Sequence, residues 1–115
     1  MPHLKKDKQV KVEVFEGVTR ITLAGGKDVL LARFEYKKGS RVPPHTHAYE
    51  QVTYVLKGKQ RIIILCEDRK EDFIVEEGDS YLVPANHEHQ QITLEETETI
   101  DCLSLIHISE PTRRS

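Results

Sequence analysis

Cysteine is scarce in this chain. Two residues, Cys66 and Cys102, are too few among 115 to form the disulfide framework of a small secreted scaffold. Cys66 directly follows the apolar run 62–65, where a free thiol behaves as a small buried hydrophobe. We therefore expect both cysteines to be core residues rather than metal ligands, while a single bridge between them stays open.

An excess of charge of either sign is absent too, because 17 Lys and Arg oppose 19 Asp and Glu, giving a net charge of -2. Such a balance produces no basic field, so we expect no nucleic-acid partner and no membrane partner. No apolar run has the length of a membrane span, and residues 1–7 lack the apolar core of a signal peptide. As written, the chain is predicted to be cytoplasmic. A trimmed export signal would make it secreted, so its localisation is left open.

A helical period is missing as well, since no apolar stripe of period 3.6 lasts for the dozen residues that a packed helix needs. Val10, Val12 and Val14 instead alternate with Lys11 and Glu13, which is typical of a half-buried strand. Glycine and charged residues separate predicted strands at 10–14, 18–23, 29–36, 51–56, 60–66, 73–75, 80–83, 89–94 and 99–106. Strands this short and regular predict an all-β fold, either a closed barrel or a jelly roll.

The composition of two short stretches predicts that the chain reverses its direction there. The short loop Lys57-Gly58-Lys59 predicts a hairpin, and the acidic stretch 95–98 predicts a turn between the last two strands.

The run 62–65 is apolar on both faces, so one face is expected to pack on another sheet or a second subunit, and we predict a homodimer. Three tyrosines are expected to pack inside the barrel: Tyr36, Tyr54 and Tyr81.

The length fits one domain with one principal core. We divide it into a flexible N-terminal arm at 1–9, a barrel at 10–106, and a disordered or artefactual tail at 107–115. The tail resembles translated read-through of an adapter or vector, so we assign it no function and do not count His107 as a ligand.

The chemistry is concentrated in Pro43-Pro44-His45-Thr46-His47, followed by Gln51. Two histidines one residue apart in an extended segment project side by side, so both imidazoles can reach a single ion. The two prolines stiffen the approach and lower the entropy lost when the ligands are ordered. Gln51 could add a neutral oxygen, and a further ligand must come from elsewhere.

Gly39, His45-Thr46-His47 and Glu50-Gln51, followed by Gly78-Asp79, Pro84-Ala85-Asn86 and His89, resemble the two motifs of the cupin superfamily in order and spacing. The resemblance spans 39–89. It implies a small double-sheeted β-barrel with one metal ion in its mouth, held by the ligands His45, His47, Gln51 and His89.

Some positions of these motifs have alternatives. Strand alternation puts Glu50 and Gln51 on opposite faces, so only one can point at the metal, and Glu50 is the second choice. His87 is an alternative to His89, with a rim position as its more natural place. Asn86 stands where the second motif often has glycine, which asparagine can replace because it accepts left-handed geometry.

A site with three imidazoles and an amide carries no negative charge, which favours copper, with zinc, nickel, iron or manganese possible. The chain also resembles compact copper cupins that cleave cellulose oxidatively to aldonic acids, and this is the first prediction of function, with carbohydrate as the partner. The alternatives are a ring-opening isomerase of unsaturated uronates and a non-catalytic sugar- or metal-binding module. In ring-opening cupins the last strand carries Asp-x-Phe-Ser-Pro-Pro-Arg. Here Asp101 and Ser104 match, Leu103 replaces phenylalanine and the arginine is missing. No catalytic residue is assigned.

Overall fold

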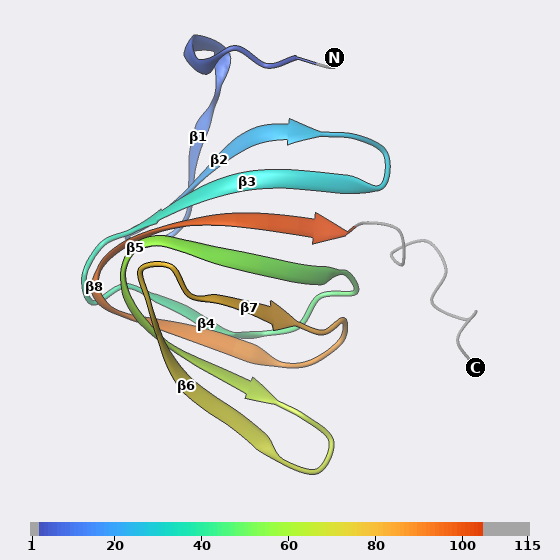
Figure 1. The fold of residues 1–115 in the computed structure, drawn as a ribbon, viewed down its shortest axis with the longest axis vertical. Helices are drawn as coiled ribbons and strands as arrows, with labels where there is room; N and C mark the ends of the chain where they lie inside the picture. Colours follow the sequence, from blue (N-terminus) through green and yellow to red (C-terminus); the bar gives the residue numbers. More distant parts are fainter. Residues whose placement is uncertain (1–2, 105–115) are drawn as a thin grey trace.

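The computed structural model describes residues 3–104 (Figure 1). Their regular elements are eight strands and one 3-10 turn, so the all-β prediction is confirmed. The elements are η1 (Lys6–Lys8), β1 (Lys11–Phe15), β2 (Val18–Gly25), β3 (Val29–Tyr36), β4 (Arg41–His45), β5 (Glu50–Leu65), β6 (Lys70–Glu76), β7 (Ser80–Val83) and β8 (His89–Ser104). The flexible character of arm 1–9 stays a prediction, and the tail 107–115 with His107 lies outside the described residues. Among the described residues no helix is long and apolar enough to cross a bilayer.

Two long strands, β5 and β8, organise the fold. They pair antiparallel over almost their whole length, from Glu50 opposite Ser104 to Ile64 opposite His89. The C-terminal half of β8 and the N-terminal half of β5 form one sheet in the order β1-β2-β3-β8-β5-β7. Their other halves form a second sheet in the order β4-β8-β5-β6. The result is the double-sheeted jelly-roll barrel that the sequence predicted.

The predicted hairpin at Lys57-Gly58-Lys59 is wrong, because β5 continues through it. Gly58 has a φ of 104° and lies where the register of β5 against β8 shifts. A Cβ there would come within 2.5 Å of the Thr97 Cα, so the glycine lets the two backbones approach closely as the strands bend. Glycine here marks a bulge rather than a reversal.

The predicted acidic turn at 95–98 is also wrong, since β8 runs without interruption through these residues. Thr97 is buried on the inner face, while the Glu98 carboxylate faces outward. Its oxygens lie 3.8 Å from Lys57 Nζ and 3.8 Å from Arg33 Nη1 on the neighbouring strands. Cross-strand charge pairing therefore accommodates the acidic side chains within a strand.

The core has two parts. One lies between β5, β6 and β7 and consists of Val55, Ile62, Ile64, Val75, Tyr81 and Val83, with Cys66 packed against it. The other is smaller and consists of Val18, Tyr36 and Val42, with Val14 and Phe34 beside it. Because β2, β3 and β4 supply its members, this smaller core forms one wall of the barrel mouth.

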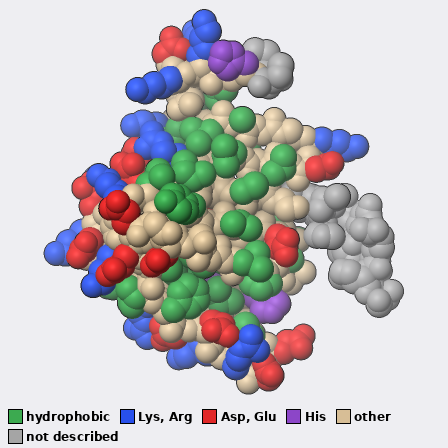
Figure 2. Space-filling model, viewed as in Figure 1, with side chains coloured by type: hydrophobic (Ala, Val, Ile, Leu, Met, Phe, Trp, Pro, Cys, Tyr) green, Lys and Arg blue, Asp and Glu red, His purple; other side chains and the backbone are tan. Residues whose placement is uncertain are grey.

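Two further predictions are wrong, and both concern residues on the outer face of the first sheet. Cys102 is exposed and not a core residue, and both cysteines are free thiols. Tyr54 is 48% exposed, whereas Tyr36 and Tyr81 are buried as predicted. The outer residues Val52, Leu82 and Cys102 lie opposite one another across β7, β5 and β8. On the face drawn in Figure 2, hydrophobic side chains gather over the middle of the molecule, and charged side chains lie mostly around them. The homodimer stays a prediction.

Candidate metal centre

Three histidines converge at the mouth of the barrel. His45 ends β4 and His89 begins β8, where the two residues lie opposite one another in register. His47 lies in the connection from β4 to β5. One ligand atom from each of the three side chains falls within 4.8 Å of the other two, and His89 is buried. This group could hold one metal ion.

Each imidazole has a fixed tautomer. The Nδ1 atoms lie 2.9 Å from backbone carbonyls two residues away: His45 on Pro43, His47 on Tyr49 and His89 on His87. A carbonyl oxygen only accepts, so each Nδ1 carries the hydrogen and donates it. The Nε2 lone pairs are then free to bind a metal, and the carbonyls orient the rings.

The Gln51 side chain points into the same centre and is fixed by two donations of its own. Its Nε2 donates to Thr53 Oγ1 at 3.0 Å and to Asp101 Oδ2 at 2.9 Å. Its Oε1 consequently faces His47 Nε2 at 3.2 Å. Both atoms are acceptors when His47 carries its hydrogen on Nδ1, so they approach each other without a hydrogen between them. A cation between them would satisfy both lone pairs, and the residues therefore fit a metal ion.

Burial sets the protonation of the centre. It lowers the pKa of His89 to about 4 and also lowers that of His47, which keeps both imidazoles neutral at pH 7. Burial raises the pKa of Asp101 to about 6, against the hydrogen bonds that it accepts from Thr99, Thr53 and Gln51. Asp101 is 2% exposed. Neutral imidazoles are the form that ligates metal.

The two alternative ligands lie elsewhere. Glu50 is exposed on the outer face of β5, whereas Gln51 is 7% exposed on the inner face. His87 is half-buried outside the three-histidine group, with Nδ1 donating to the Ala85 carbonyl at 2.9 Å. Asn86 has a φ of 65°, the left-handed geometry expected of it, and its N–H donates to the His47 carbonyl at 2.8 Å. That hydrogen bond joins the two histidine segments. The ligand role of Gln51 remains a prediction.

A cavity of about 230 Å³ opens onto the centre. Besides the histidines, Gln51 and Asp101, it is lined by apolar and aromatic residues of β1 to β4 and by Gln91 and Leu103 of β8. Arg20 and Tyr49, to which the sequence analysis gave no role, complete the lining. The Tyr49 ring stacks on His47, with centroids 3.9 Å apart and an interplanar angle of 3°. Arg20 shares a face of β2 with Val18, but Ile21 on the opposite face is buried too, so strand alternation alone gives no signal for Arg20.

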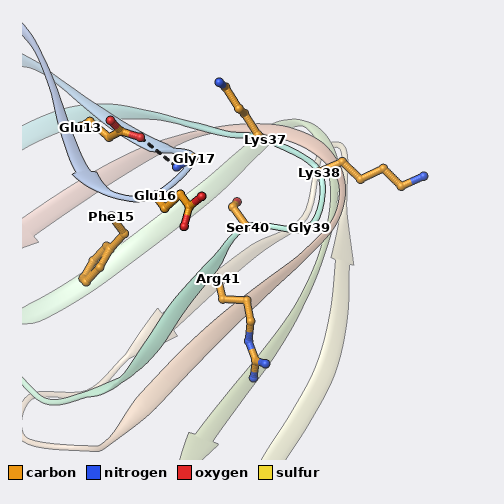
Figure 3. Close-up of a pocket in the computed structure, with 9 residues that line it drawn as sticks. All are labelled: Glu13, Phe15, Glu16, Gly17, Lys37, Lys38, Gly39, Ser40 and Arg41. Atoms are coloured by element: carbon orange, nitrogen blue, oxygen red, sulfur yellow. Dashed lines mark hydrogen bonds between the residues drawn. The ribbon is translucent and has the colours of Figure 1, made fainter.

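A second cavity of about 730 Å³ lies where the β1–β2 and β3–β4 connections meet (Figure 3). Glu13 and Glu16 line it, together with Lys37, Lys38 and Arg41. Glu13 is occupied as an acceptor from the Gly17 N–H at 3.0 Å, and both lysine side chains extend outward in Figure 3. Its lining includes none of the three clustered histidines, so its greater size does not make it the metal centre.

A family model described as the cupin domain matches residues 32–105. The chain belongs to the cupin family. This cupin is 29% identical over 85 residues to the pectin degradation protein KdgF of Dickeya dadantii (strain 3937), a match that covers 73% of this chain and 74% of that protein. It is 28% identical over 109 residues to the vicilin Cor a 11.0101 of Corylus avellana, covering 92% of this chain but only 24% of the vicilin.

Solved structures share the fold. An RmlC-like cupin from Shewanella frigidimarina matches with a TM-score of 0.81 at 20% identity, covering 91% of each chain. KdgF from Halomonas sp. matches with a TM-score of 0.78 at 23% identity, covering 90% of this cupin and 94% of that chain. Bacillus subtilis oxalate decarboxylase, a protein with Mn(II) centers, matches with a TM-score of 0.79 at 18% identity, covering 88% of this cupin and 28% of that chain. At these identities the likeness concerns the fold.

Proposed function

We propose that this cupin is a metal-dependent isomerase that opens the ring of unsaturated uronates, the sugar acids left by pectin breakdown. The observation that carries the proposal is one small cavity in which the three-histidine group lies beside the buried carboxyl of Asp101. The similarity to a pectin degradation protein along about three quarters of both chains (73% and 74%) supports it.

The reaction rearranges the substrate without an external oxidant. The anomeric hydroxyl of the unsaturated uronate loses a proton, the bond between the anomeric carbon and the ring oxygen breaks, and an aldehyde forms. The ring oxygen keeps the electron pair as an enolate, and protonation of the neighbouring alkene carbon gives an α-keto acid. A proton therefore leaves an oxygen and a proton arrives at a carbon, so the product is an isomer of the substrate.

The residues of the cavity suit these steps. Nε2 of His45, His47 and His89, with Gln51 Oε1, would hold a divalent ion, which when bound supplies Lewis acidity toward the substrate oxygens. Asp101 is a carboxyl among the cavity-lining residues and can accept or return the proton. Its two oxygens are oriented by donations from Thr99 at 2.7 Å, Thr53 at 3.0 Å and Gln51 at 2.9 Å.

Oxidative cleavage of cellulose, the first prediction from the sequence, would use the same centre and depend on copper. The relatives described above include a pectin degradation protein and none named for cellulose. The cavity of about 230 Å³ also lies below the roughly 300–1,000 Å³ of ordinary small-molecule pockets, so we expect its ligand to be small, such as a monosaccharide. The uronate alternative therefore moves to first place. The charge-free donor set leaves copper, zinc, nickel, iron and manganese as metals to be distinguished by elemental analysis.

The test offers both substrates to the same metal-loaded protein. Unsaturated galacturonate is followed by NMR, and cellulose with Cu²⁺ and a reductant is analysed for aldonic acids. We expect the α-keto acid to form faster than in buffer and no oxidised cello-oligosaccharide. Oxidised products without ring opening would favour the copper-dependent cleavage of cellulose. If neither product forms, a non-catalytic binding module is favoured.

A further inference from the structure

Arg20 occupies an inward-facing position of β2. Val18, two residues before it on the same face, is 0% exposed, and Arg20 lies opposite Phe34 of β3. Both Val18 and Phe34 line the cavity of the metal centre together with Arg20, whose side chain is half-buried. A guanidinium at this position lies in the substrate cavity rather than on a solvated face.

The Arg20 charge has no ionic partner within the described part of the chain. Among residues 3–104 no carboxylate lies within ion-pair distance of it, and none of their side-chain hydrogen bonds involves it. Arg33, on the outer face of the adjacent strand, instead pairs with Glu35 at 2.8 Å and Glu98 at 3.8 Å. A half-buried cation without a partner loses solvation and gains nothing in return unless a ligand supplies the anion.

The surroundings of Arg20 favour the binding of an anion, because a second hydrogen-bond donor lies in the same cavity. The Tyr49 phenol lines the same cavity, and its hydroxyl is a hydrogen-bond donor. The Asp101 carboxyl lines the same cavity, but its three hydrogen bonds come from Thr99, Thr53 and Gln51. The cationic side chain on β2 therefore stays available to an incoming acid.

We propose that Arg20 is a specificity-determining residue that binds the carboxylate of a sugar acid in this cavity, with the Tyr49 ring beside it. A guanidinium fork matches a carboxylate in two parallel hydrogen bonds. The cavity would thus select uronates over neutral sugars. The identity of the acid as a uronate rests on the proposed function, whereas carboxylate binding by Arg20 can be measured without turnover.

The binding test is calorimetric titration with galacturonate and with galactose, which differ chiefly in the carboxylate. We expect wild type to prefer galacturonate, and Arg20→Gln to weaken galacturonate binding by roughly 10- to 100-fold, as expected for hydrogen bonds to a charged group. Arg20→Lys should recover part of the loss. The control Arg33→Gln removes the same charge from the outer face and should bind as wild type does. Metal content and melting temperature are measured for every variant to exclude damage to the centre or the fold.

Kinetics separate this inference from the proposed function. With unsaturated galacturonate, Arg20→Gln should raise KM far more than it lowers kcat, because binding rather than proton transfer is affected. If wild type opens no uronate but binds galacturonate through Arg20, the proposed function fails and carboxylate recognition stands. Equal affinity of Arg20→Gln and wild type for galacturonate would overturn the inference, as would failure of the wild type to bind galacturonate.

Discussion

Beside the metal centre, the inner and outer faces of the paired strands β5 and β8 reverse the usual distribution of polarity, whereas farther along β5 the inner residues Val55, Ile62 and Ile64 belong to the apolar core. On the inner face, Gln51, Thr53 and Asp101 are at most 7% exposed and are joined by hydrogen bonds of 2.9 to 3.0 Å. On the outer face of the same β5 segment, Val52 is 50% exposed and Tyr54 48%. A buried polar group is costly unless its hydrogen bonds are made, and this inner network makes them.

The two faces suit different roles. The hydrogen-bonded network of Gln51, Thr53 and Asp101 leaves the Gln51 Oε1 lone pair and the histidine Nε2 lone pairs for a ligand that completes the site. An apolar outer face is suited to a protein partner, which agrees with the homodimer predicted from the sequence. The following experiments challenge the two halves of this comparison, beginning with the largest expected effect.

The inner face should lose its metal when one imidazole is removed. His89→Ala is expected to weaken metal affinity by at least roughly 100-fold, more than is typical of outer-shell changes. The matched control His87→Ala, two residues away and outside the three-histidine group, should load normally. Elemental analysis after loading and desalting measures both. Loss of metal in His87→Ala alone would place the wrong histidine in the centre.

The buried carboxyl should be needed for the chemistry. Asp101→Asn is expected to lower the rate of ring opening by roughly 100-fold or more, the usual contribution of an acid–base group, with the metal retained. Asp72→Asn is the control, since that carboxylate pairs with Arg61 on the protein surface at 2.6 Å. An unchanged rate in Asp101→Asn would remove Asp101 from the mechanism.

The metal-free protein should show two opposed pH effects. His89, with a pKa lowered to about 4, takes up a proton more readily in the unfolded chain, so its stabilising contribution is lost as pH falls from about 6.5 to 4. Asp101, with a pKa raised to about 6, binds a proton more readily when folded, so its contribution is lost as pH rises through about 6.

In a variant that lacks one of these two groups, the pH dependence of stability should follow the group that remains. In Asp101→Asn, stability should fall on acidification by on the order of 2–3 kcal/mol, and in His89→Gln it should rise between pH 6 and 4. Urea midpoints across this range measure both trends. Parallel pH profiles in the two variants would contradict the assigned environments.

The outer face should govern association with little effect on the site. Val52→Glu places a charge among Leu82 and Cys102 and is expected to convert the predicted dimer into a monomer. Ile74→Glu on β6, where the residue is 46% exposed, is the control outside that patch. Analytical ultracentrifugation distinguishes the two states. A monomeric wild type would remove the dimer and leave the apolar face to another partner.

The alternation of inward and outward residues along strands made much of the fold and part of the site predictable from the sequence. The strand ranges 29–36 and 80–83 agree with β3 and β7, and the same rule put Glu50 and Gln51 on opposite faces. The choice of Gln51 as the inward residue came from the cupin resemblance. Gly58 and the acidic stretch 95–98 were misassigned because glycine and clustered charge also occur at reversals. Only the pairing of β5 with β8 reveals that both strands continue. Arg20 was missed because a charged residue on a strand is usually solvated, and its place in the cavity depends on how β2 packs against β3 and β4.

The most direct test of the central claim is a metal titration of the metal-free protein, with the opening of unsaturated galacturonate followed by NMR at each step. If the three-histidine group holds the catalytic ion, the rate should rise in proportion to bound metal, level off at one ion per chain, and return to the buffer rate with a chelator. Ring opening at full rate in the metal-free protein, or a rate that stays at the buffer level when the site is full, would contradict it.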